Sequence, residues 1–253
     1  MSERGFHPMR ALRRWRANRA SGGPSRLDLK AINLAYVAAL KTKMPHDAAM
    51  ELAIGGDFGP MGAIQAALLR HYGLPQDGYL VDVGCGSGRL ARPMSQWLTG
   101  RYLGLDLVPD LVDHARAIAA RPDWRFEVID HIGIPEADRR ADMVCFFSVL
   151  THLLQEQGYW YLEEARRVLK PGGVIVFSFL ELRDPVHWRI FLDTLQTAKD
   201  RTVSPINVFL DRETLGLWAK GLDLDLVEIR GGAETVVEEG PLGQAVCVLR
   251  KPG

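Results

Sequence analysis

The stretch YLVDVGCGSGRL at residues 79–90 decides the fold class. Its first five residues are apolar except for Asp82 and have the length of a strand buried on both faces. Gly84, Gly86 and Gly88 follow at alternate positions, where the missing Cβ atoms permit a tight turn and a close approach of the backbone to a ligand. We expect a helix to start directly after this loop, so that its free N–H groups face the ligand. The stretch therefore predicts a ligand-binding turn between a strand and a helix.

Strand-like and helix-like segments alternate through the hundred residues that begin here. We expect strands at 79–83, 101–107, 125–129, 142–147 and 173–179, and helices near 89–98, 110–120 and 156–169. The expected strands are continuous apolar runs, which is typical of strands covered on both faces. Strict alternation of the two elements predicts a mainly parallel sheet with helices on both sides.

Further helical segments flank this alternating region. Before it, apolar residues at helical spacing predict helices over 29–41, after Pro45 and near 61–72. After it, we expect an inserted helix over 185–199, a helix near 212–220 and two β segments at 222–230 and 244–250. The chain is thus interpreted as a tail (1–26) and one domain (27–253), which comprises a helical prelude (27–75), a core (76–180), an insertion (181–210) and a closing helix with a β-pair (211–253).

The composition is that of an ordinary globular protein. Of the 253 residues, 47% are hydrophobic and 25% are charged, which supplies enough apolar material for a well-filled core. Lysine plus arginine and aspartate plus glutamate both number 31, so a broad phosphate-binding surface is not expected and nucleic acid is not an expected partner. Three widely spaced cysteines, Cys85, Cys145 and Cys247, argue against a disulfide framework and favour a reducing compartment, so we expect a cytoplasmic protein.

The first 26 residues differ from the rest in charge, since they hold seven arginines and one acid, Glu3. Three interpretations are open: a disordered, solvated tail, an arm that makes weak contact with anionic lipid or another acidic partner, and an arginine-rich organellar transit segment. We prefer the first, because biased termini often lack a fixed partner. No apolar run approaches the ~20 residues that span a bilayer, so no transmembrane segment is expected. The sequence carries no signal for the oligomeric state.

An acidic residue, Asp106, closes the second expected strand, twenty residues after Gly86. A carboxylate at this place can accept hydrogen bonds from both hydroxyls of a ribose. Nicotinamide-dependent enzymes share this geometry, but they prefer a third glycine one place later, where this chain has Arg89. Because Arg89 could still approach a phosphate, the spacing alone does not exclude a nicotinamide-dependent enzyme.

The remaining motifs, taken together, argue against a nicotinamide-dependent enzyme. They are the loop stretch itself, Asp106, Asp130 after the third strand, ADMVCFFSVLTHL at 141–153 and RRVLKPGGVIVFSF at 166–179. Together they resemble the class I S-adenosylmethionine-dependent methyltransferases over roughly residues 75–180. The resemblance implies a doubly wound, Rossmann-like, seven-stranded and mostly parallel sheet with an antiparallel last strand. It also implies S-adenosylmethionine as the cofactor.

The resemblance assigns the glycine loop to the methionine and ribose portion of the cofactor. Gly84, Gly86 and Gly88 would pack against that portion, and Cys85 belongs to the same contact. Asp82 would orient the loop and, directly or through water, the amino group of the cofactor.

The strand ends would hold the other parts of the cofactor. Asp106 would take the ribose hydroxyls, with Leu107 beside it, and Asp130 would accept from the adenine amine, with the backbone of His131 nearby. Ser148 would offer its carbonyl or its hydroxyl to the methionine amino group. All of these residues follow the carboxyl ends of expected strands, where open α/β sheets bind their ligands.

His152 is the best-placed candidate for a catalytic base. The sulfonium is a strong electrophile, so the protein has to align the acceptor and exclude water, and an oxygen acceptor also needs a group that removes its proton. The usual histidine pKa of about 6.5 suits that task. A histidine that only orders the loop is an equally strong interpretation.

A metal ion is not expected at this site. Ubiquinone-pathway O-methyltransferases resemble this chain but carry magnesium-binding glutamates where Ser148 and Thr151 stand. Serine and threonine are poor replacements for carboxylates at a hard cation. Both that pathway and a metal requirement are therefore in doubt.

Two further groups of residues could border the acceptor. Glu181 or His187 could act as the base, with Trp188 as an apolar wall, although aromatic residues at helical spacing mostly belong to a core. Tyr36, His46 and Phe58 could cover the cofactor as a lid, and for these residues packing is again the preferred interpretation.

We therefore expect methyl transfer from S-adenosylmethionine to a small molecule, at oxygen rather than nitrogen, with a sugar, lipid or secondary metabolite as the acceptor. One alternative is a cofactor-binding sensor or partner subunit without turnover. Another is a nicotinamide-dependent reductase.

Overall fold

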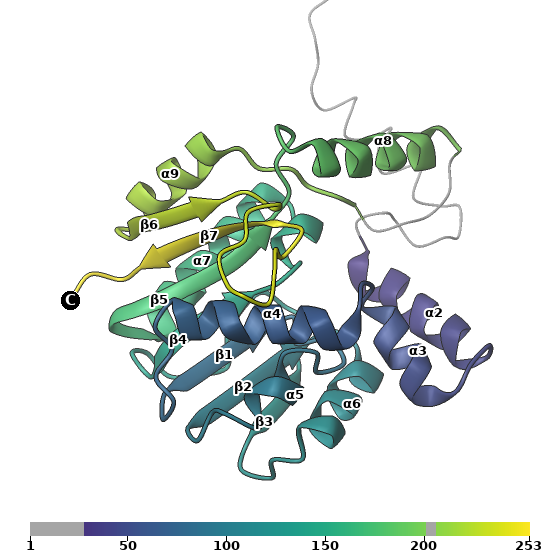
Figure 1. The fold of residues 1–253 in the computed structure, drawn as a ribbon, viewed down its shortest axis with the longest axis horizontal. Coiled ribbons are helices and arrows are strands. Elements are labelled where there is room, and N and C mark those ends of the chain that lie inside the picture. Colours follow the sequence, from purple (N-terminus) through teal and green to yellow (C-terminus); the bar gives the residue numbers. More distant parts are fainter. Residues whose placement is uncertain (1–27, 201–205) are drawn as a thin grey trace, which may run out of the picture.

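The computed structural model describes residues 28–200 and 206–253, and a seven-stranded sheet lies at its centre (Figure 1). The strands are β1 (Tyr79–Val83), β2 (Arg101–Asp106), β3 (Arg125–Val128), β4 (Ala141–Phe146), β5 (Leu169–Phe179), β6 (Asp225–Arg230) and β7 (Ala245–Arg250). Their order in the sheet is β3-β2-β1-β4-β5-β7-β6. The pairs from β3 to β5 are parallel, and β7 runs antiparallel to both of its neighbours. The expected doubly wound sheet with an antiparallel last strand is confirmed.

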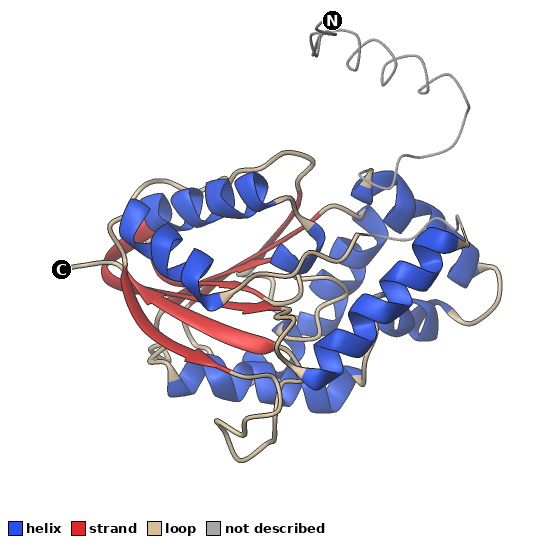
Figure 2. Cartoon of the chain, turned by 90° about the horizontal axis from the view of Figure 1, so that it is seen from above, coloured by secondary structure: helices blue, strands red, loops and turns tan. Residues whose placement is uncertain are grey.

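Helices cover both faces of this sheet (Figure 2). The helices are α2 (Leu29–Lys41), α3 (His46–Ala53), α4 (Phe58–His71), α5 (Ala91–Met94), α6 (Pro109–Ala119), α7 (Gln155–Val168), α8 (Pro185–Lys199) and α9 (Arg212–Gly221), with a short 3-10 turn at Leu150–His152. Buried side chains of α4, α5 and α6 form one apolar cluster with the sheet, and those of α7 and α9 form another. Side chains of β1 alternate between the clusters, since Tyr79 and Val81 belong to the second and Leu80 to the first. Burial on both faces explains why the strands are continuous apolar runs.

Four element boundaries differ by three or more residues from the sequence-based expectation, and one of them is that of β6, which starts at Asp225 rather than 222. Only the four residues of α5 are helical where a helix over 89–98 was expected, and turns occupy the rest. Pro93 explains this, because it has no N–H to donate to the carbonyl of Arg89. Strand β5 starts at Leu169 rather than 173, with a register shift between Ala141 and Met143 on its partner, and Gly172 takes a φ of 79° there. Helix α4 begins at Phe58, three residues before the expected start.

Helices α2 and α3 lie beyond the sheet, next to the carboxyl ends of its parallel strands (Figure 1). Asp28 caps α2 by accepting from the backbone N–H of Ala31, as expected. A small apolar cluster fastens the two helices to the start of α6, and its buried members are Val37, Leu40, Ala49, Met50, Val108 and Leu111. The Lys41 amine adds an ion pair of 2.6 Å with Asp110. This attachment is modest, because exposed ion pairs contribute only about 0–1 kcal/mol.

Residues 1–27 lie outside the described part of the chain, so the expectation for the arginine-rich tail stays a prediction. Within the described ranges, no single helix combines the length and the apolar character needed to cross a membrane. Only α3 and α4 taken together, bent by 51° at their break, meet both criteria.

Gly62 on α4 offers a test of this packing. A Cβ atom at Gly62 would collide with the backbone carbonyl oxygen of Arg89, whereas a Cβ atom at Gly59, on the same helix, would meet nothing within 4 Å. We expect Gly62→Ala to lower the free energy of unfolding by roughly 1–3 kcal/mol, because neither backbone can yield cheaply. Gly59→Ala is the matched control and should be neutral or stabilising by up to about 1 kcal/mol. Urea unfolding of the three proteins measures both effects, and equal stability of the two variants would contradict the packing described here.

Candidate active site

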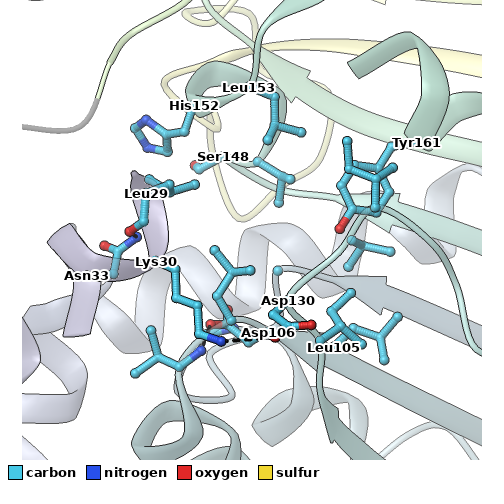
Figure 3. A pocket seen from close by; sticks show the side chains of 18 of the residues that line it. Leu29, Lys30, Asn33, Leu105, Asp106, Asp130, Ser148, His152, Leu153 and Tyr161 are labelled. Atoms are coloured by element: carbon cyan, nitrogen blue, oxygen red, sulfur yellow. Dashed lines mark hydrogen bonds and ion pairs between the residues drawn. The ribbon is translucent and has the colours of Figure 1, made fainter. Parts of the chain in front are cut away.

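A cavity of about 440 Å³ opens at the carboxyl ends of β1, β2 and β4 (Figure 3). Eight of the residues predicted for the site line it: Gly84, Gly86, Asp106, Leu107, Asp130, His131, Ser148 and His152. Asp82, Cys85 and Gly88 do not line it. Helix α2 closes one side with Leu29, Lys30 and Asn33, and the end of α3 adds Ile54. The structure thus brings most of the predicted residues to one place and adds a wall from the helical prelude.

The glycine loop is shaped by contacts within the protein. Gly84, Gly86 and Gly88 all take positive φ values, of 79°, 54° and 92°, which favour glycine. A Cβ atom at Gly86 would lie 2.8 Å from Cγ2 of Ile54, one at Gly88 would lie 2.7 Å from Cα of Ala115, and one at Gly84 would overlap Val149. The sequence analysis explained these glycines by the approach of a ligand and by a helix starting behind the loop. The structure adds a second reason for these glycines, because neighbouring elements of the chain leave little room for a Cβ atom, and it corrects the helix start, because turns separate the loop from α5.

Asp106 fixes the loop to the end of β2. One carboxylate oxygen accepts from the N–H of Gly86 at 3.0 Å, and the other accepts from the N–H of Val108 at 3.0 Å. Burial raises the pKa of Asp106, while these backbone hydrogen bonds oppose that shift. Two more N–H groups of the loop, those of Gly84 and Cys85, donate to the carbonyl of Leu105. The carboxylate therefore lies at the cavity wall in a fixed orientation.

Asp82 and Cys85 lie beneath the loop. The Asp82 carboxylate accepts from the Tyr102 hydroxyl and from Sγ of Cys145, and only 2% of the residue is exposed. Burial raises the pKa of Asp82 to about 6, and these two donors counteract part of that shift. Cys85 is also buried, and its Sγ would lie 3.1 Å from a Cβ atom at Gly104. These positions support the loop from below and do not reach the cavity.

Asp130 lies at the open rim of the cavity. Its side chain is 64% exposed and forms an ion pair of 3.2 Å with Lys30 of α2 (Figure 3). Hydrogen bonds from Lys30 and His131 hold the pKa of Asp130 below its usual range. Sequence reasoning missed Lys30 and Asn33, because nothing in a surface pattern of α2 indicates which turn of the helix will face a strand end fifty or more residues away.

His152 lines the cavity, and one of its ring nitrogens has a hydrogen-bond partner. Its Nδ1 lies 2.7 Å from the carbonyl oxygen of Ile206, and since a carbonyl only accepts, Nδ1 must carry the proton. Nε2 then bears the lone pair, and it has no hydrogen-bond partner among residues 28–200 and 206–253. Burial lowers the pKa of His152 below 6.5, and the hydrogen bond to Ile206 counteracts part of the shift. The imidazole is therefore neutral at pH 7 and can accept a proton at Nε2.

Ser148 at the end of β4 adopts a φ of 60°, an unusual value for a residue with a Cβ atom. Its hydroxyl donates to Oε1 of Gln244 at 3.1 Å, and its carbonyl accepts from the Thr151 hydroxyl at 3.0 Å. Both groups that the sequence analysis offered to the cofactor therefore already have a partner in the chain. A carbonyl has two lone pairs, so the Ser148 carbonyl can still accept a second hydrogen bond.

The alternative base candidates lie away from the cavity. Both carboxylate oxygens of Glu181 bind Arg212, at 2.8 and 2.9 Å. Nδ1 of His187 accepts from the N–H of Glu181, so its other nitrogen carries the proton and donates to the carbonyl of Gly243 at 3.0 Å. Trp188 stacks on Phe191, with ring centroids 5.1 Å apart. Neither Glu181 nor His187 has a free lone pair directed at the cavity, so they are not bases for it.

The lid candidates and Arg89 have structural contacts instead. Tyr36, His46 and Phe58 do not line the cavity. Phe58 is buried, as the packing interpretation expects, whereas Tyr36 and His46 are exposed. The Arg89 guanidinium donates to the carbonyls of Ile54 and Gly55 and so ties the end of α3 to the glycine loop. Because these two carbonyls hold the guanidinium, Arg89 is not positioned to bind a phosphate.

Comparisons with known proteins agree with this geometry. Residues 80–173 match the family model for a methyltransferase domain. A malonyl-[acyl-carrier protein] O-methyltransferase of Yersinia pestis is 34% identical over 111 residues, which are 43% of this chain and 39% of the relative. A ubiquinone biosynthesis O-methyltransferase of Cereibacter sphaeroides is 32% identical over 117 residues, which are 44% of this chain and 45% of the relative. The matches thus span less than half the length of these curated relatives.

A solved structure of an S-adenosylmethionine-dependent methyltransferase from Methanosarcina mazei superposes with a TM-score of 0.56 at 19% identity, covering 73% of this chain and 97% of the other. At this identity the likeness concerns the fold. The matched residues 80–173 contain the glycine loop, Asp106, Asp130, Ser148 and His152. Residues 80–173 thus match a methyltransferase domain, and the fold is one that a solved S-adenosylmethionine-dependent methyltransferase also has.

Proposed function

We propose that this chain transfers the methyl group of S-adenosylmethionine to an oxygen atom of a small molecule. One observation carries the proposal: a single cavity at the carboxyl ends of the strands is lined by the partly buried Asp106 and by His152, whose Nε2 has no hydrogen-bond partner among the described residues. A binding group and a proton acceptor are thus available together. Both curated relatives described above are O-methyltransferases by name, which supports transfer to oxygen.

The residues of the cavity fit the cofactor. The volume of about 440 Å³ lies within the range of about 300–1,000 Å³ that is usual for small-molecule sites. Asp106 offers an acceptor for ribose hydroxyls, and Asp130 stands at the rim for the adenine amine. Apolar side chains line the space between these two carboxylates, which suits a flat ring, and they include Leu107, Ile129 and Ile132.

The cofactor supplies, when bound, a methyl group activated by a positively charged sulfur. The protein residues hold it, exclude water and remove the acceptor proton. Water exclusion falls to α2 and the end of α3, where Leu29 and Ile54 face the loop. Nε2 of His152 would take the proton of an acceptor hydroxyl, while the bond from Nδ1 to the Ile206 carbonyl stabilises the imidazolium that forms.

The acceptor side of the cavity is mostly apolar among the described residues, and it includes Val149, Leu153, Leu154 and Ile206. This surface supports a lipid or a secondary metabolite better than a sugar. Ser148 and Thr151 stand where the ubiquinone-pathway enzymes carry magnesium ligands, so we do not assign the chain to that pathway or to a metal-dependent reaction. A sensor without turnover uses the same cofactor site and is distinguished by the tests below.

Asp106 can be tested by cofactor affinity. We expect Asp106→Asn to weaken binding of S-adenosylhomocysteine at least tenfold, because the amide lacks the second acceptor oxygen that a ribose and the loop both need. Asp113→Asn is the matched control, since Asp113 is exposed on α6 and, among the described residues, pairs with Arg116 alone. Isothermal titration calorimetry measures both variants. Absence of binding to the wild-type protein, or a preference for NAD, would refute the proposed cofactor.

His152 can be tested by a substitution that keeps its hydrogen bond. In His152→Asn the side-chain amide can still donate to the carbonyl of Ile206, but no group is left to accept a proton. We expect the turnover number to fall by roughly 10²–10⁴-fold, as is usual on loss of a general base, with S-adenosylhomocysteine affinity unchanged. Transfer of a labelled methyl group to metabolite extract provides the assay. Wild-type turnover in this variant would show that His152 only orders the loop, and no product from any extract despite cofactor binding would favour the sensor.

The pH profile gives an independent check on His152. Because burial lowers its pKa, the neutral imidazole persists as the pH falls, and the base is lost only below the usual 6.5. The turnover number should therefore be level from pH 7 to 8 and decline only when the pH drops below about 6.5. A decline that starts above pH 7 would contradict this assignment.

A further inference from the structure

Ser148 occupies a conformation that its own backbone disfavours, at the wall of the cavity. Its φ of 60° falls in the left-handed region, where a residue with a Cβ atom is strained. Such residues persist only when their surroundings fix them, and they gather at functional sites. The contacts that fix Ser148 are therefore informative about the site.

Three side chains hold Ser148 in place, those of Ser178, Gln244 and Thr151, and the first two are remote from it in sequence. The backbone N–H of Ser148 donates to Oγ of Ser178 at 2.7 Å. Oγ of Ser178 donates in turn to Oε1 of Gln244 at 2.6 Å, and the Ser148 hydroxyl donates to the same Oε1 at 3.1 Å. The carbonyl of Ser148 accepts from the Thr151 hydroxyl. Every polar group of Ser148 thus has a partner, and Ser148, Ser178 and Gln244 form a closed ring of hydrogen bonds.

The sheet topology brings this ring together. Ser178 lies near the end of β5 and is fully buried, opposite Val246 of β7. Because β7 runs antiparallel, its first residues lie at the edge where β4 and β5 end, and Gln244 directly precedes them. A parallel strand in this place would bring its last residues to the cavity instead.

We propose that Gln244 and Ser178 are positioning residues, which hold Ser148 in the left-handed conformation that sets the shape of the cofactor cavity at the end of β4. The inference rests on the proposed function in one respect, namely that the cavity binds S-adenosylmethionine and its product. We do not propose that the side chain of Gln244 or of Ser178 contacts the cofactor. Their effect passes through the backbone of Ser148.

Gln244→Leu tests the proposal, because it removes the shared acceptor at a partly exposed position. We expect S-adenosylhomocysteine to bind about five- to tenfold more weakly, measured by calorimetry. Gln244→Glu retains an acceptor oxygen and should restore binding to within about twofold of the wild type. Gln96→Leu, an exposed position far from the cavity, is the matched control and should bind as the wild type does.

A double-mutant cycle isolates the conformational role. Glycine adopts a positive φ without strain, so Ser148→Gly should make the ring dispensable. In the Ser148→Gly background, Gln244→Leu should change S-adenosylhomocysteine affinity by less than about twofold. An equal loss in both backgrounds, or no loss from Gln244→Leu alone, would overturn the proposal.

Thermal unfolding without any ligand separates this inference from the proposed function. Gln244→Leu should lower the melting temperature by about 3 °C in the wild-type background and by clearly less after Ser148→Gly. If S-adenosylhomocysteine fails to bind the wild-type protein while this difference persists, the proposed function fails and the role of the ring stands. If binding is normal and the difference is absent, the ring does not hold Ser148.

Discussion

The site depends on the hydrogen bonds between the Asp106 carboxylate and the N–H groups of Gly86 and Val108. They join the end of β2 to the loop after β1, at the point where the strand order changes direction between β1 and β4. Such a switch point leaves a crevice, because the connections on its two sides run to opposite faces of the sheet. Without the carboxylate, the two N–H groups would lack an acceptor at a buried site and the loop would lose its fixed position. The cavity is therefore a consequence of topology that one side chain stabilises.

Helices α2 and α3 line one side of the cavity and are attached to the core by few contacts. These include the apolar cluster around Met50 and Leu111, two exposed lysine–aspartate pairs, the contact of Asp47 with His114 and the bonds from Arg89. Exposed ion pairs add little, and the cluster is small beside the two cores of the sheet. Segments with few buried contacts open most readily. The weak attachment of α2 and α3 thus agrees with a binding site that must exchange its ligand.

Local patterns were sufficient to predict the sheet and the residues at strand ends. Apolar runs between helical segments gave the strands from β1 to β5 within a few residues, and acids at strand ends gave Asp106 and Asp130 because the topology places them at one edge. Lys30, Ile54 and Gln244 could not be found in this way. Each reaches the site from another layer or from the antiparallel strand, and its position depends on packing angles that no local pattern encodes. The short α5 was also missed, although Pro93 was a visible signal.

Two histidines show why residue type alone was insufficient. His152 and His187 were both candidate bases, and the first is partly buried while the second is fully buried. Nδ1 of His152 donates to a carbonyl, which leaves the lone pair on Nε2 free. Nδ1 of His187 accepts from a backbone N–H, and its Nε2 must donate to the Gly243 carbonyl, so no lone pair is left. The two rings thus differ in the hydrogen bond at Nδ1, whose partner is a carbonyl for His152 and a backbone N–H for His187. The backbone that surrounds each ring provides this partner, and the partner determines whether Nε2 keeps a free lone pair.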